Sequence, residues 1–147
     1  MRYIQKRLVV KKMLVAIAGL LIILGINSCA QKISFLTSSV VPAAEGTVKV
    51  KTDDNNNYEI KISLSHLADP ERLQPSKKMY VVWMESDRDI ARNIGRINSS
   101  RGFLSGKLKA SFETVSSGKP NKIVITAEDD ASVQFPGTQV VLSTKNF

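Results

Sequence analysis

Apolar and polar residues alternate with a period of two along several stretches of this chain. A β-strand directs successive side chains to opposite faces, so this alternation predicts strands with one buried and one solvent-facing side. It is clearest at residues 47–51, 59–64 and 107–113, where every second residue is apolar. The five residues from Asp53 to Asn57 are all turn formers, so the first two stretches are predicted to form a hairpin.

Other strands are predicted where short apolar runs lie between turn-forming residues. Residues 79–84 (Met-Tyr-Val-Val-Trp-Met) form a continuous apolar run, which is typical of a central strand buried on both faces. Three further strands are expected at 94–97, 123–125 and 140–142. About seven strands at this spacing predict an all-β fold, an antiparallel Ig-like β-sandwich. Two short helical turns are alternatives at 87–92 and at 67–73, the second broken by Pro70.

A different pattern occupies the first part of the chain. Residues 1–12 carry five basic residues and no acidic one, and the 14 residues from Met13 to Ile26 carry no charge. As a helix this run is roughly 21 Å long, which is shorter than the ~30 Å hydrocarbon core of a bilayer. A basic segment followed by an apolar run of this length is typical of a secretory signal.

The only cysteine of the chain, Cys29, follows this run. Ile26-Asn27-Ser28-Cys29 resembles the lipobox of bacterial lipoproteins, although Asn27 stands where a small residue is common. The resemblance implies cleavage before Cys29 and diacylation of its thiol. An uncleaved signal anchor and ordinary cleavage that leaves a free thiol are the alternatives. Ala30 is not the acidic residue associated with inner-membrane retention, so the resemblance implies the outer membrane, facing the periplasm.

These features divide the chain into three parts. Residues 1–28 are predicted to be a lipoprotein signal peptide, residues 29–45 a lipid-anchored tether that merges into a first edge strand, and residues 46–147 the β-sandwich domain. The formal charge of +8 is largely a property of the signal, since the other 135 residues hold 16 basic and 13 acidic residues. The remaining excess forms no basic stripe, so we expect no nucleic-acid partner.

The second half of the chain resembles the extracytoplasmic domain of anti-sigma-K factors. The matching segments are Tyr80-Val81-Val82-Trp83, Ile94-Gly95-Arg96-Ile97, Ile123-Val124-Ile125-Thr126-Ala127-Glu128 and Val140-Val141-Leu142-Ser143. The family's domain is an all-β, Ig-like sandwich, and the matching residues Tyr80, Trp83 and Gly95 are expected to be structural residues of its core. The family's cytoplasmic sigma-binding domain has no counterpart here, so the resemblance covers the sensory side alone.

Few residues are candidates for chemistry. His66 is the only histidine, and without a nucleophile motif around a serine it is expected to be structural or solvent-exposed, so no enzymatic activity and no cofactor are predicted. Acidic residues in three predicted loops are weak candidates for a divalent cation, and solvated loop charges are the simpler interpretation. These candidates are Asp53, Asp87, Glu128, Asp129 and Asp130, with Glu85 and Asp89 beside Asp87.

Two functions are compatible with these patterns. The first is a non-enzymatic envelope module that binds another envelope protein, senses, or serves structurally. The second is a small-ligand or polysaccharide-binding lipoprotein that uses loops at the end of the sandwich. A pocket lined by Arg92, Arg96 or Arg101 together with Glu128 would favour the ligand, and a flat, closed sandwich would favour the protein partner.

Overall fold

The computed structural model describes residues 11–13, 30–87, 90–97 and 109–147 of the chain. Residues 11–13 are helical, and the rest of the predicted signal, together with Cys29 at the start of the predicted tether, lies outside the described residues. The part that is described forms eight strands and one short 3₁₀ helix. In chain order these are β1 (Gln31–Ser34), β2 (Glu45–Thr52), β3 (Tyr58–Ser65), η1 (Pro70–Arg72), β4 (Met79–Ser86), β5 (Arg92–Ile97), β6 (Lys109–Ser116), β7 (Pro120–Glu128) and β8 (Val140–Ser143).

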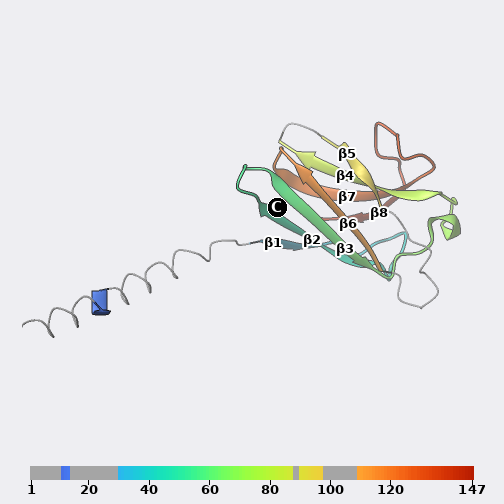
Figure 1. The fold of residues 1–147 in the computed structure, drawn as a ribbon. Helices are drawn as coiled ribbons and strands as arrows, with labels where there is room; N and C mark the ends of the chain where they lie inside the picture. Colours follow the sequence, from blue (N-terminus) through green and yellow to red (C-terminus); the bar gives the residue numbers. More distant parts are fainter. Residues whose placement is uncertain (1–10, 14–29, 88–89, 98–108) are drawn as a thin grey trace, which may run out of the picture.

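The strands form two four-stranded antiparallel sheets that are the two layers of a sandwich (Figure 1). The first sheet has the order β1-β2-β3-β6 and the second has the order β5-β4-β7-β8. The all-β, antiparallel sandwich predicted from the alternation is therefore confirmed. The edge strand expected near the start of the domain is β1, which adds an eighth strand to the predicted seven.

The main core lies between the sheets and consists of the apolar residues of the alternating strands. The first sheet contributes Val48 and Val50 from β2 and Ile60, Ile62 and Leu64 from β3. The second sheet contributes Tyr80, Val82 and Met84 from β4 and Ile123, Ile125 and Ala127 from β7. Each fully buried aliphatic side chain stabilises the fold by roughly 1.5–3 kcal/mol relative to an exposed one, so this layer is the principal source of stability.

Strand β4 is buried on both faces, as its continuous apolar run predicts. Its alternate residues Val81 and Trp83 are fully buried on the outer face of the second sheet, where they form a second cluster with Val124 of β7. Residues 129–139, which connect β7 to β8, supply Val133 to this cluster. The second sheet therefore has an apolar core on each side, whereas the first sheet has one.

The chain after β1 closes one side of the sandwich. The backbone N–H of Phe35 donates to Gly46 O of β2 at 3.1 Å, and the next N–H, of Leu36, donates to Ser143 O of β8 at 2.8 Å. A Cβ atom at Gly46 would overlap the Leu64 side chain, so glycine permits this close packing. The segment after β1 thereby joins β1 and β8, the edge strands of the two sheets, and covers the core between them.

The predicted helical turns have different outcomes. A 3₁₀ turn does form within 67–73, but Pro70 begins it instead of breaking it, because proline lacks only an N–H that the first turn leaves unpaired. The Asp69 side chain accepts a hydrogen bond from the N–H of Glu71 and caps this turn. The turn proposed at 87–92 is not supported at its end, since Arg92 belongs to β5, while residues 88–89 lie outside the described part.

Candidate functional site

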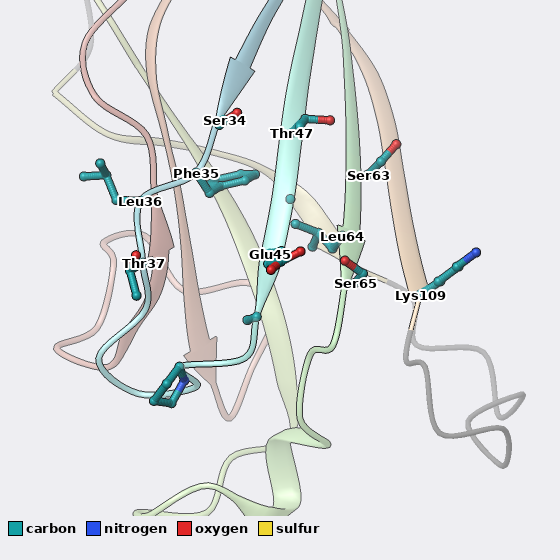
Figure 2. A pocket seen from close by; sticks show the side chains of 13 residues that line it. Ser34, Phe35, Leu36, Thr37, Glu45, Thr47, Ser63, Leu64, Ser65 and Lys109 are labelled. Atoms are coloured by element: carbon teal, nitrogen blue, oxygen red, sulfur yellow. The ribbon is translucent and has the colours of Figure 1, made fainter.

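A hollow of about 650 Å³ lies where the chain passes from β1 to β2. Figure 2 shows its lining residues gathered around the start of β2. They come from the end of β1 and the segment after it, from the start of β2, from the end of β3 and from the start of β6. The lining is Ser34, Phe35, Leu36, Thr37, Pro42, Ala44, Glu45, Gly46, Thr47, Ser63, Leu64, Ser65 and Lys109.

Small hydroxyl side chains form the sheet side of this hollow. Ser34 pairs with Thr47 across β1 and β2, and Thr47 pairs with Ser63 across β2 and β3, so the three share the outer face of the first sheet. The next pairs on this face bring Glu45, Ser65 and Lys109 together. These hydroxyls, with one carboxylate and one ammonium group, can hold a polar molecule by hydrogen bonds. Phe35, Leu36 and Pro42 supply an apolar wall.

The only histidine lies next to this hollow in sequence. His66 follows Ser65, is exposed, and has a left-handed backbone with φ of 57°. It takes the chain out of β3, and it is outside the lining of the hollow. Its placement agrees with a structural, solvent-facing role.

Asp53 lies in the β2–β3 hairpin of the first sheet, and the other acidic candidates for a metal site lie at opposite ends of the second sheet. Strands β4 and β7 pair with Met79 opposite Glu128 and Ser86 opposite Pro120. Asp87 therefore follows one end of the sheet and Glu128 lies at the other, more than 20 Å away at about 3.3 Å per residue. Among the described residues no three His, Cys, Asp or Glu side chains lie together as metal ligands, and Asp89 is outside that part.

Asp53 and Asp130 each accept hydrogen bonds from residues of their own turn. Asp53 accepts from the N–H groups of Asn55 and Asn57, both at 2.8 Å, and the bond from the Asn57 backbone is the main reason that the pKa of Asp53 is lowered. Asp130 accepts from the N–H of Ser132 at 2.8 Å, and this bond lowers the pKa of Asp130. Such bonds are typical of turns built around an aspartate. The hairpin turn predicted at Asp53–Asn57 is present.

Two further candidates are held by side chains of other elements. Asp87 accepts from the Asn121 side chain at 2.6 Å, close to the start of β7. Asp129 forms an ion pair of 2.7 Å with Lys77, and the hydrogen bond to Asp129 raises the pKa of Lys77. Both pairs tie a loop to the end of a strand.

Glu128 differs from the other acids because it is buried, with 6% of its surface exposed. Its Oε1 accepts from the backbone N–H of Gly137 at 2.7 Å and from the Thr126 hydroxyl at 2.6 Å. The Thr126 hydroxyl in turn accepts from the Trp83 indole N–H at 2.8 Å. Glu128 is therefore a structural anchor of the 129–139 loop and not the solvated loop charge that its acidic neighbours suggested.

The three residues singled out as structural occupy separate positions. Tyr80 lies in the core between the sheets, and its hydroxyl donates to Ala68 O at 2.9 Å; burial raises the pKa of this phenol. Trp83 lies on the opposite face of the same strand, beneath the 129–139 loop. Gly95 lies on β5 with φ of 139°, and the Phe112 ring packs where a side chain would begin.

The arginines proposed as a ligand site do not converge on Glu128. Arg92 lines a shallow groove of about 420 Å³ together with the segment Ala131–Gln134, and Glu128 is not part of its lining. Asn93 attaches this segment to β5, since its side-chain amide donates to Ala131 O at 2.9 Å and to Val133 O at 3.2 Å. Arg96 lies exposed on β5, and Arg101 is outside the described residues.

Two exposed apolar side chains beside this groove were missed by sequence reasoning. Ile90 precedes β5 and is 93% exposed, and Phe135 lies in the 129–139 loop and is 81% exposed. Each is one residue away from the lining of the Arg92 groove. Neither belongs to an alternating pattern, so the sequence had no signal for their exposure beyond their position in turn-rich segments.

No helix within the described residues is long and apolar enough to span a membrane. A comparison of the chain with protein-family models, with curated proteins and with solved structures found no match.

Proposed function

We propose that the chain is a lipid-anchored, non-enzymatic protein of a bacterial cell envelope, whose sandwich binds another envelope protein. The observation that carries this proposal is the position of Cys29, which follows the apolar run 13–26 and stands two residues before Gln31, the first residue of β1. An acylated Cys29 would attach the folded domain to a membrane with Ala30 as the only spacer. The outer membrane, with the domain in the periplasm, is the proposed location.

The partner-binding part of the proposal is supported by the surface of the second sheet. Ile90 and Phe135 expose large apolar side chains, and each is one residue away from the lining of the Arg92 groove. Aromatic side chains and arginine are enriched at protein interfaces. The 129–139 loop that carries Phe135 is held by Glu128 and Asn93, so the side chain is presented from a fixed backbone. The resemblance to a sensory extracytoplasmic domain agrees with this role.

Acylation can be tested by expressing the full chain in a Gram-negative host. The N-terminal peptide of the mature protein is expected to begin at Cys29 and to carry a diacylglyceryl group, detected by its mass. Cys29→Ser should abolish the modification and the processing that depends on it. Ser28→Ala keeps a small residue before the cysteine and should leave both intact. An unmodified Cys29 thiol in the native protein would exclude the lipid anchor.

Partner binding can be tested by crosslinking in the intact envelope. A photo-reactive phenylalanine analogue at position 135 is expected to give one crosslinked protein of constant mass. The matched control is the same analogue at Val115, which is 59% exposed on β6 of the other sheet. If position 135 gives no product, or the same products as position 115, the interface does not lie on the second sheet.

A second function, binding of a small polar ligand, is favoured by the hollow beside Ser34 and Thr47. Its volume of about 650 Å³ lies within the range of small-molecule sites, and its lining combines hydroxyls with a carboxylate and an ammonium group. Ligand binding there would shift the amide resonances of Thr47, Ser63 and Ser65 in an NMR titration. Crosslinking at position 135 does not depend on this hollow, so the two functions can be separated.

A further inference from the structure

Three lysines form a row across the outer face of the first sheet. Lys32 of β1 lies directly opposite Lys49 of β2, and Lys49 lies directly opposite Lys61 of β3. All three are exposed. Directly opposed residues of neighbouring strands have their Cβ atoms about 4.5–5.5 Å apart, and like charges at such positions destabilise the sheet. The arrangement therefore has an electrostatic cost that the fold itself does not explain.

Acidic residues neutralise only part of the positive charge on this face. Lys61 forms an ion pair with Glu113 of β6, and Lys51 lies directly opposite Glu59. Within the described residues, Lys32 and Lys49 have no ion pair. The uncompensated charge is thus concentrated on β1 and β2.

The neighbouring positions leave this face open to a flat partner. The next row on the same face consists of Ser34, Thr47, Ser63 and Ser111, none of which has a side chain larger than threonine. Among the described residues, Lys32 and Lys49 are both exposed. A broad anionic surface can therefore approach the ammonium groups, and hydroxyls stand beside them to donate hydrogen bonds to phosphate oxygens.

The row also begins close to the proposed anchor. Lys32 is three residues after Cys29, so their Cα atoms are at most about 11 Å apart. Attraction to an anionic lipid surface acts over about 8–10 Å at physiological salt, and each lysine near such a surface strengthens binding about fivefold. Lys32 and Lys49 are thus within reach of the headgroups of the membrane that would hold the acyl chains.

We propose that Lys32, Lys49 and Lys61 dock the outer face of the first sheet on anionic phospholipid headgroups. This inference rests on the proposed function, because the anchor at Cys29 is what brings the row to a bilayer. Docking in this orientation turns the second sheet, with Ile90 and Phe135, away from the membrane. The compensating anion explains why two adjacent lysines without an acidic partner are compatible with the sheet.

The full protein, reconstituted into vesicles, allows a direct test. One vesicle type contains phosphatidylcholine alone and the other contains phosphatidylcholine with 30% phosphatidylglycerol. Acetylation of each lysine by an N-hydroxysuccinimide ester is followed by mass spectrometry. Lys32, Lys49 and Lys61 are expected to react at least fivefold more slowly on the anionic vesicles at low salt, and this difference should disappear at high salt. Lys78, exposed at the start of the second sheet, should react equally on both and is the internal control.

Variants separate docking from folding. In the double variant Lys32→Ser, Lys49→Ser, the acetylation rate of Lys61 on anionic vesicles should rise to its rate on neutral vesicles. In Lys78→Ser, Lys61 should remain protected on anionic vesicles. The double variant removes a like-charge pair, so its melting temperature should not fall. Equal lysine rates on the two vesicles would overturn the proposal, as would protection that appears only with an added acidic protein. The intact mass reports acylation of Cys29 separately, so loss of the anchor and loss of docking are different results.

Discussion

Replacing Gly95 by alanine is expected to destabilise the domain by about 2–5 kcal/mol. Gly95 has φ of 139°, a backbone conformation that residues with a Cβ rarely adopt. A Cβ at this position would lie 2.8 Å from Phe112 Cε2 of β6. The expected loss therefore combines backbone strain with overpacking between β5 and β6. Equilibrium urea unfolding measures it, with the fluorescence of Trp83, the only tryptophan, as the signal.

Two further variants identify the cause of this loss. Gly118→Ala is the matched control, because its Cβ would have no neighbour closer than 3.9 Å, and it should change the unfolding free energy by less than about 0.5 kcal/mol. Phe112→Leu in the Gly95→Ala background should recover the part that is due to the clash. If Gly95→Ala proved as stable as the unchanged protein, the strained conformation assigned to β5 would be wrong.

Periodicity predicted the strands well because it depends on the local geometry of each segment. Alternation fixed which residues of β2 and β3 face the core, and the turn residues Asp53–Asn57 joined them into a hairpin. The pairing of β3 with β6 and of β4 with β7 depends on contacts between segments far apart in the sequence. No local pattern specifies such pairs, so the order of strands in each sheet had to come from the structure.

The candidate sites were less predictable than the fold for a physical reason. Glu128 follows an apolar strand and precedes two aspartates, so the sequence suggested a solvated acidic loop. Its burial results from the 129–139 loop folding back over Trp83, and that loop has no periodicity from which its course could be inferred. The lysine row could not be predicted from the sequence either. Lys32, Lys49 and Lys61 are far apart in sequence and become neighbours only through the register of three strands.

Replacing Glu128 by leucine is expected to destabilise the fold by roughly 3 kcal/mol and to release the 129–139 loop. Leucine would fill similar space but would leave the Gly137 N–H and the Thr126 hydroxyl without their acceptor in a buried site. A hydrogen bond to a charged group contributes about 1.5–3 kcal/mol, and an unpaired buried donor costs about 1–3 kcal/mol. Trp83 lies beneath this loop and is fully buried, so its emission should shift to longer wavelength and become accessible to acrylamide before the domain unfolds.

Glu128→Gln is the matched control for this prediction, because the amide keeps one oxygen that can accept from Gly137 and Thr126. A neutral acceptor forms bonds about half as strong as a carboxylate, so we expect roughly half the loss and no exposure of Trp83. Hydrogen exchange at the Gly137 amide should accelerate strongly in Glu128→Leu and only slightly in Glu128→Gln. Equal stability of all three proteins would show that the loop is held by Asn93 and Val133 alone. Graded losses in the predicted order would establish the buried carboxylate as the residue that keeps Phe135 in position on the second sheet.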